Sequence, residues 1–147
     1  MEQQLLFWDI ETTGLTCFDQ VVEFAAIRTD MEFNELQRHH FKVKLTRDVV
    51  PNPEAMIIHR IGVGADAEAW SEDHAVHEIH RILNTPGTLS GGYNTLGFDD
   101  EFMRFSFHRH FLPPYTHQYA GGCGRFDLYP MLVMFQQFKP SIMDWPK

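Results

Sequence analysis

The sequence predicts one α/β domain with a mixed sheet, in which an antiparallel meander of three strands is followed by a helix and a parallel strand. Short polar turns separate three apolar segments and so predict the meander: Leu5–Ile10, Val21–Thr29 and Leu36–Leu45. The segment Glu72–Asn84 has the helical period, with one apolar face made of Ala75, Ile79, Ile82 and Leu83. Thr88–Tyr93 is the next strand, and a strand reached through a helix usually pairs in parallel.

The composition is that of one globular domain. The chain has 147 residues, of which 44% are hydrophobic, so it can bury a single core. No apolar run is long enough to cross a membrane, and the N-terminus does not have the pattern of a signal peptide. Cys17 and Cys123 lie far apart without a CxxC motif, which is typical of reduced thiols in a cytoplasmic protein. The net charge of −8 argues against a phosphate-binding surface spread over the whole molecule but permits a local site.

The most informative stretch begins where the first strand ends, at Asp9-Ile10-Glu11-Thr12-Thr13-Gly14. Residues i and i+2 of a strand point to the same side, so Asp9 and Glu11 aim at one spot. Paired carboxylates of this kind suit Mg²⁺ or Mn²⁺, and Gly14 permits a tight exit that lets a ligand approach the backbone. A strand end with two solvated acids is the alternative, but the apolar strand before and Thr-Thr-Gly after favour the metal site.

A second stretch, Tyr93-Asn94-Thr95-Leu96-Gly97-Phe98-Asp99-Asp100, lies where the fourth strand ends and the next helix begins. That helix, about Asp99–His110, is expected to bury Phe102, Phe105 and Phe107. The two aspartates could simply complement the helix dipole. Tyr93 and Asn94 instead indicate a fixed turn that aims one acid into the crevice at the carboxyl ends of the strands, beside Asp9 and Glu11.

The remaining elements are shorter or less regular. Pro51 and Pro53 mark a loop and the start of a short helix over Glu54–His59, which Gly62 and Gly64 end. Prolines and glycines predict an irregular loop over Leu112–Gly124. Its Tyr115 and Tyr119 could stack on bases or pack onto the domain. Arg125-Phe126-Asp127 is expected to open a last helix, Leu128–Phe138, followed by an extended tail, Lys139–Lys147.

Two sets of polar residues receive a structural interpretation. Glu23 is an acid within an apolar strand, and we interpret it as an edge or rim residue. His74, His77 and His80 recur at spacings of three along one predicted helix, which could allow zinc binding. The polar face opposite an apolar stripe explains these histidines equally well, and we interpret them as surface residues.

Together these motifs resemble the DEDD (DEDDh) 3′→5′ exonuclease superfamily, and within it bacterial exonuclease I, the single-strand-specific exodeoxyribonuclease I. The resemblance rests on the two acidic stretches and on further segments that extend it over essentially the whole chain: 23–34, 92–102, 125–128 and 144–146. It implies a ribonuclease H-like fold, with a mixed sheet flanked by helices.

The resemblance also implies a site and a substrate. Asp9 would bridge two Mg²⁺ ions, Glu11 would bind one ion close to the 3′-terminal nucleotide, and Asp99 would hold the second; Mn²⁺ could replace Mg²⁺. Arg104, Tyr115 and Tyr119 match positions that contact single-stranded DNA. The expected products are 5′-mononucleotides, released stepwise from 3′ ends of single-stranded DNA.

One departure from the family is expected to limit activity. The third motif of the family is a histidine, the general base, followed five residues later by an aspartate, and no His-x-x-x-x-Asp follows Asp99. Residues 1–147 are therefore expected to be a C-terminally truncated exonuclease domain without the third-motif helix and the later domains, which could include contacts to a single-stranded DNA-binding protein. Alternatives are a binding module that grips single-stranded ends or a partner without cutting, and an exonuclease that acts on RNA.

Overall fold

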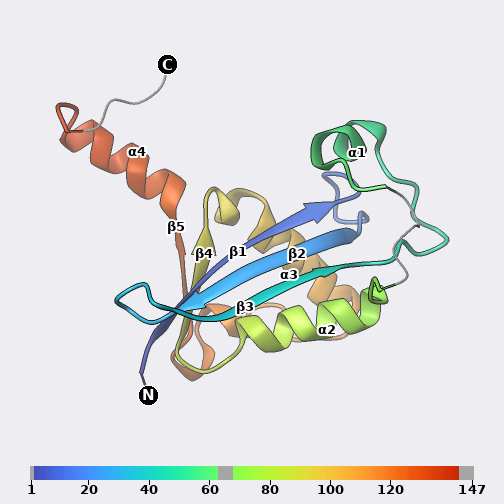
Figure 1. Ribbon diagram of the computed structural model, residues 1–147, viewed down its shortest axis with the longest axis horizontal. Helices are drawn as coiled ribbons and strands as arrows, with labels where there is room; N and C mark the ends of the chain where they lie inside the picture. The colour runs from blue at the N-terminus through green and yellow to red at the C-terminus, as the bar shows by residue number, and fades with distance from the viewer. Residues whose placement is uncertain (1, 63–67, 143–147) are drawn as a thin grey trace.

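The protein is built on a five-stranded mixed sheet with the strand order β3-β2-β1-β4-β5 (Figure 1). The computed structural model describes residues 2–62 and 68–142. The strands are β1 (Gln4–Thr12), β2 (Val21–Thr29), β3 (Glu35–Lys42), β4 (Thr88–Gly92) and β5 (Gly124–Asp127). The pairs β1–β2 and β2–β3 are antiparallel, whereas β4 pairs in parallel with β1 and with β5. The predicted meander and the predicted parallel strand are both confirmed.

The helices follow the expected order with small differences in their ends. They are α1 (Pro53–His59), α2 (Glu72–Leu83), α3 (Asp99–Arg109) and α4 (Leu128–Phe138). The strand predicted to reach Leu45 ends at Lys42. The next residue, Val43, still donates its N–H to the carbonyl oxygen of Val22 on β2 at 2.8 Å, and it also bridges Trp70. None of the described helices combines the length and the apolar character needed to cross a bilayer.

The core lies between one face of the sheet and the helices α2 and α3. Leu6, Trp8 and Ile10 alternate along β1 and point into this layer, where they pack with residues of β2, α2 and α3. The predicted apolar face of α2 is confirmed, since Ala75, Ile79, Ile82 and Leu83 are all buried. The opposite face of β1 is covered by neither helix, and it is the face that carries the acidic side chains of this strand.

The prediction for α3 was wrong in one residue. Phe102 and Phe107 are buried, but Phe105 is only half-buried. Phe105 lies instead under the guanidinium group of Arg104, whose Cζ is 4.1 Å from the centre of the ring. A helical period alone does not distinguish an aromatic ring in the core from one that a cation covers at the rim.

The C-terminal third contains a strand that the sequence did not reveal. Residues 125–127 were expected to open the last helix, whereas Gly124–Asp127 forms β5, and Phe126 packs edge-on against Phe7 with ring centres 5.5 Å apart. Four residues are too few for a strand pattern to be recognised. The preceding loop also contains two short 3-10 turns, η2 (Thr116–Gln118) and η3 (Ala120–Gly122), where only irregular structure was expected. The expected tail turns at residues 140–142, and residues 143–147 lie outside the described residues.

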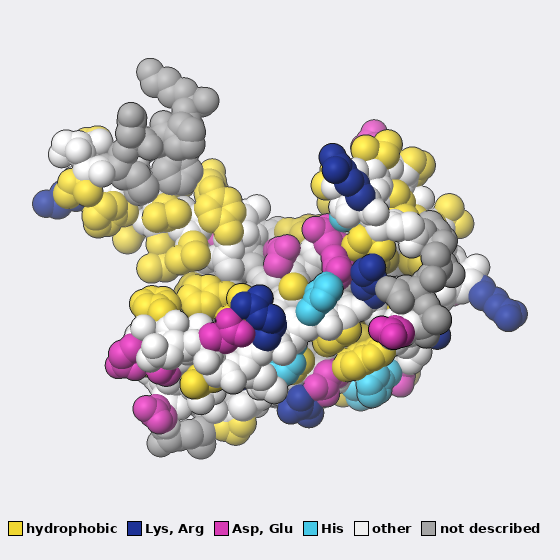
Figure 2. Space-filling view, in the orientation of Figure 1, with side chains coloured by type: hydrophobic (Ala, Val, Ile, Leu, Met, Phe, Trp, Pro, Cys, Tyr) yellow, Lys and Arg dark blue, Asp and Glu magenta, His cyan; other side chains and the backbone are white. Residues whose placement is uncertain are grey.

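Helix α4 has no buried residue, although it is rich in apolar side chains. In Figure 1 it projects away from the sheet, and in Figure 2 hydrophobic side chains cover it. Phe138 is 78% exposed, and Met131, Met134 and Phe135 are also exposed. An exposed apolar surface of this kind favours association with other apolar surfaces.

We expect the double variant Phe135→Gln, Phe138→Gln to bind less of the dye ANS and to self-associate less than the parent chain, because it removes two exposed rings from α4. Dye fluorescence and sedimentation at rising concentration measure these effects. The matched control is Leu15→Gln, Val50→Gln, which changes two apolar side chains elsewhere that are more exposed than Phe135 and Phe138. Equal dye binding by both double variants would contradict the prediction.

Candidate active site

Asp9 and Glu11 lie on the sheet face that α2 and α3 leave uncovered. Their neighbours Trp8 and Ile10 are buried on the opposite face, so strand alternation directs both carboxylates outward together. Asp9 is exposed and Glu11 is half-buried. Figure 2 shows acidic side chains gathered on this face, between α1 and the middle of the sheet. This geometry agrees with the prediction that the two carboxylates point to the same side of the strand.

Asp99, the first residue of α3, lies close to both of them. Its carboxylate contacts the backbone amide of Ile10, and its side chain is almost completely buried. Burial, then the negative charge of Asp9 and then that of Glu11 raise the pKa of Asp99 to about 7 from its ordinary value of 3.8. The turn after β4 thus aims one acid back toward the end of β1, as the sequence indicated.

The same crowding affects the two acids of β1. Desolvation raises the pKa of Glu11, with a further contribution from the charge of Asp9, while His59 acts in the opposite direction. Desolvation also raises the pKa of Asp9, to which the charge of Glu23 adds. Raised pKa values on several neighbouring carboxyl groups are typical of sites that bind cations.

Glu23 is a fourth acid of this cluster, which the sequence analysis missed. It was interpreted as an edge or rim residue. The edge alternative is wrong because β2 is an interior strand, but Glu23 lies near the start of β2, directly opposite Glu11 in the β1–β2 ladder. His40 on β3 hydrogen-bonds to it, with 2.8 Å between Nε2 and Oε1. The sequence did contain a signal for this contact. In an antiparallel hairpin the register determines which residues face each other, and here it places Glu23 opposite Glu11.

The acids of this cluster suit divalent cations by their chemistry. Carboxylate oxygens are hard ligands, which Mg²⁺ and Mn²⁺ prefer. Among the residues that the structure describes, only Asp73, His77 and His110 bring three ligand atoms within 4.8 Å of one another, so the carboxylates of Asp9, Glu11 and Asp99 are spaced more widely. A wider set of three carboxylates can be shared between two ions.

Asp127 fixes the turn that carries Asp99. This turn includes Asn94, which has a left-handed backbone with φ of 62°. The buried carboxylate of Asp127 accepts hydrogen bonds from the backbone N–H groups of Asn94 at 2.8 Å and Leu96 at 3.0 Å. It also caps α4 by accepting from the Tyr129 N–H. Sequence reasoning missed this role because it depends on a contact between residues about thirty positions apart.

Asp100 points away from the acid cluster and is neutralised elsewhere. Its buried carboxylate accepts from Nε2 of His117 at 3.0 Å, from Gln118 at 3.2 Å and from the guanidinium group of Arg125. The hydrogen bond and charge of His117, followed by Arg125, hold the pKa of Asp100 below its usual range despite burial. Two adjacent aspartates therefore have opposite electrostatic environments, and only Asp99 belongs to the candidate site.

Gly14 lies in the tight exit from β1, as predicted. A Cβ atom at this position would lie 2.6 Å from Oδ1 of Asp19, so the Asp19 side chain would have to move. The Asp19 carboxylate also accepts hydrogen bonds from the hydroxyl groups of Thr13 and Thr16. The glycine thus leaves room for the carboxylate that closes the loop after β1.

The residues predicted to contact DNA lie on α3 and in the loop after it. Arg104 forms an ion pair with Glu101 at 2.7 Å, and its guanidinium carbon lies 5.6 Å from the centre of the Tyr115 ring. Tyr115 and Tyr119 are both exposed, the latter by 70%. The structure therefore brings Arg104 and Tyr115 together and leaves both tyrosine rings accessible.

The exonuclease family model of the RNase T type matches residues 6–135. The chain belongs to this exonuclease family. It is also similar to exodeoxyribonuclease I from Escherichia coli, with 35% identity over 150 residues that cover 99% of this chain and 31% of the relative. The enzyme from Buchnera aphidicola of Schizaphis graminum is 34% identical, again over 99% of this chain and 31% of its own length.

Solved structures give the same family relationship. The zinc-bound form of the E. coli exonuclease I complex with single-stranded DNA matches with a TM-score of 0.94 and 34% identity, covering 100% of this chain and 32% of that one. The complex of the E. coli enzyme with the C-terminal segment of single-stranded DNA-binding protein (SSB) matches with the same score and identity, covering 33% of that chain. The resemblance to exonuclease I and the ribonuclease H-like fold are thereby confirmed, and the chain spans about a third of these relatives.

In the metal-free protein, we expect the Asp99 carboxyl group to titrate near pH 7, and Asp9→Asn to lower this pKa by removing a neighbouring negative charge. Carbon NMR of the carboxyl group measures both. Because the folded pKa lies above the unfolded value, the free energy of unfolding should fall as the pH rises from about 4 to about 7, and Asp99→Asn should remove that slope. A carboxyl group that titrates near pH 4 would contradict the assignment.

We expect Asp127→Ala to lower the free energy of unfolding by about 2 kcal/mol, because it leaves the amides of Asn94 and Leu96 unpaired and removes the cap of α4. It should also weaken Mn²⁺ binding, since the turn positions Asp99. Urea unfolding and a Mn²⁺ titration measure the two effects. Asp30→Ala, which opens an exposed turn between β2 and β3, is the control and should leave Mn²⁺ binding unchanged; a parallel loss in both variants would argue against positioning.

Proposed function

We propose that residues 1–147 form a metal-dependent 3′→5′ exonuclease domain that acts on single-stranded DNA and releases 5′-mononucleotides. The observation that carries this proposal is the convergence of Asp9 and Glu11 from β1 with Asp99 from α3, where burial, together with the charges of Asp9 and Glu11, raises the pKa of Asp99 to about 7. Such a cluster in a chain of the exonuclease family is suited to the divalent ions of phosphodiester hydrolysis.

In this proposal Asp9, Glu11 and Asp99 would together hold two Mg²⁺ ions, with Asp9 contributing to both, Glu11 to the one near the 3′-terminal nucleotide and Asp99 to the other. Mn²⁺ would fit the same oxygen ligands. The bound ions would supply an activated water and charge stabilisation for the leaving 3′ oxygen. The protein contributes the fixed spacing of the carboxylates, which the buried face of β1 and the Asp127 turn maintain.

The proposed DNA contacts are local, in keeping with the net charge of −8. Arg104 would contact a phosphate, and the exposed rings of Tyr115 and Tyr119 would stack on bases. E. coli exonuclease I has been solved with single-stranded DNA and with the C-terminal segment of SSB, and this likeness supports single-stranded DNA as the substrate. Contacts to SSB would involve regions outside residues 1–147.

The activity of the isolated chain depends on the third motif of the family, the histidine followed five residues later by an aspartate. Within residues 1–147 no His-x-x-x-x-Asp follows Asp99, so these residues alone do not supply the general base and the fourth metal ligand of the family. Loss of a general base costs about 10²–10⁴ in rate. We therefore propose that the isolated chain holds metal weakly and hydrolyses DNA slowly.

We expect slow shortening of an end-labelled single-stranded oligonucleotide in Mg²⁺, at least about 10²-fold slower than by a family member that carries the third motif. Asp9→Ala should abolish what remains, whereas Asp30→Ala should not. Matched DNA and RNA oligomers test the sugar preference, and filter binding with and without Mg²⁺ tests for binding alone. Rapid shortening would contradict the proposed weak activity, and binding without cleavage that survives Asp9→Ala would favour a binding module.

A further inference from the structure

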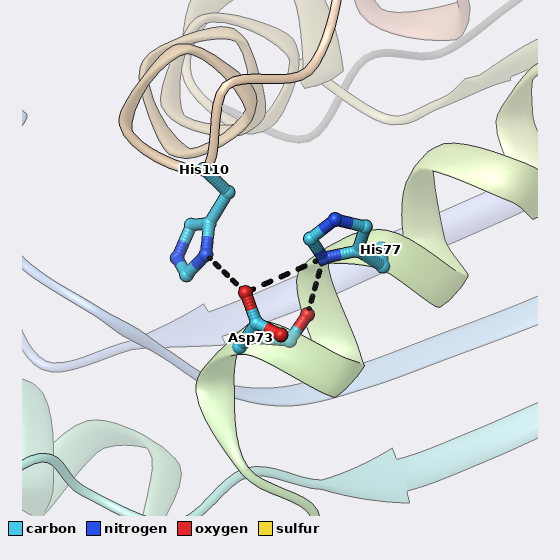
Figure 3. Close-up of side chains that lie close together, drawn as sticks. All are labelled: Asp73, His77 and His110. Atoms are coloured by element: carbon cyan, nitrogen blue, oxygen red, sulfur yellow. Dashed lines mark hydrogen bonds and ion pairs between the residues drawn. The ribbon is translucent and has the colours of Figure 1, made fainter.

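A second group of metal-ligating side chains lies at the junction of α2 and α3. Asp73 and His77 are one turn apart on α2, and His110 is the C-terminal cap residue of α3 (Figure 3). Ligand atoms from the three residues all lie within 4.8 Å of one another. Nδ1 of His110 is 3.2 Å and Nδ1 of His77 is 3.5 Å from Oδ1 of Asp73. Figure 3 shows both imidazole rings turned toward this carboxylate.

These separations match the edges of a tetrahedral zinc site. Zinc binds histidine nitrogen and carboxylate oxygen at about 2.0–2.1 Å, which places neighbouring ligand atoms of a tetrahedron about 3.3 Å apart. The two measured edges, 3.2 and 3.5 Å, lie on either side of that value. Two histidines and one carboxylate are also a ligand set that zinc accepts with a water in the fourth position. The third edge, between the ligand atoms of His77 and His110, is within 4.8 Å, so the two rings would move closer together to complete the site.

The other ring nitrogen of His110 has a partner of the expected kind. Its Nε2 lies 3.8 Å from Oε1 of Glu72, and Arg109 lies 3.4 Å from the same oxygen. A carboxylate beside the far nitrogen of a ligating histidine orients the ring and increases its basicity. Glu72 and Asp73 together outweigh Arg109 in charge, so the surroundings are favourable for a cation.

We propose that Asp73, His77 and His110 form a Zn²⁺ site that clamps the start of α2 to the end of α3. The zinc hypothesis in the sequence analysis grouped His77 with His74 and His80, and the structure separates them. His74 packs edge-on against Trp70, with ring centres 4.5 Å apart, and Nε2 of His80 lies 3.0 Å from the Pro113 carbonyl oxygen. Only His77 faces the third ligand from the neighbouring helix.

This site is distinct from the acid cluster of the sheet. Helix α3 begins at Asp99 and its cap residue is His110, so eleven residues separate the two sites by about 16 Å along the helix axis. An ion in one site cannot share ligands with an ion in the other. Zinc binding at Nδ1 would replace the hydrogen bonds that now join His77 to the Asp73 carbonyl oxygen and His110 to the Asp73 carboxylate, with each neutral ring carrying its proton on Nε2 instead.

A metal titration with the full chain tests the proposal. Asp9→Asn, Asp99→Asn serves as the parent, so that the acid cluster contributes little to the signal. We expect one equivalent of Zn²⁺ by calorimetry, and Co²⁺ should give the visible absorption of a four-coordinate ion. His77→Ala and His110→Ala should each weaken Zn²⁺ binding by more than about 100-fold. Loss of a residue that only hydrogen-bonds to a metal ligand costs about 10- to 100-fold in affinity, and loss of the ligand itself should cost more.

The matched controls are His74→Ala on α2 and His108→Ala on α3, two exposed histidines outside the triad. They should retain the affinity of the parent. Zn²⁺ should also raise the Tm of the parent and of both controls, but not of His77→Ala, because an ion that binds only the folded state stabilises it. Equal Zn²⁺ affinity across all four variants, or a Tm increase that persists in His77→Ala, would overturn the proposal.

Discussion

The structure depends on the alternation of side chains along β1. Leu6, Trp8 and Ile10 are buried against α2 and α3, which fixes the register of the strand, because a slip of one residue would expose all three. The same alternation places Asp9 and Glu11 on the uncovered face. Packing on one face of β1 therefore sets which side chains lie on the other face. The direction of the two acids follows from this alternation and does not require a separate contact for each.

The third acid depends on contacts between distant parts of the chain. The turn from β4 into α3 is held by Asp127 from β5, and the adjacent Asp100 is neutralised by His117 and Arg125. These contacts give the two adjacent aspartates different surroundings. The charge of Asp100 is neutralised inside the fold, whereas the charge of Asp99 is poorly compensated. The loop after α3 and strand β5, which contribute no acid to the cluster, thus support the position of Asp99.

Features that depend on local interactions could be predicted from the sequence, and features that depend on contacts between distant residues could not. The meander, the face of α2 and the convergence of Asp9 with Glu11 depend on local periodicity, and all were predicted. Strand β5, the turn held by Asp127 and the meeting of His77 with His110 depend on tertiary contacts between residues more than 30 positions apart, and none was predicted. Glu23 could be predicted only in part. The hairpin implied that it faces Glu11, but it was interpreted as an edge or rim residue.

The directly opposed pair Glu11 and Glu23 has a consequence for how the domain has been shaped by selection. Like charges across a ladder weaken the hairpin that contains them, and Asp9 and Asp99 add to the repulsion. A sequence chosen for robustness alone would replace some of these acids. Under the proposed function, their presence together is a trade-off in which folding is made less favourable and cation binding is made more favourable.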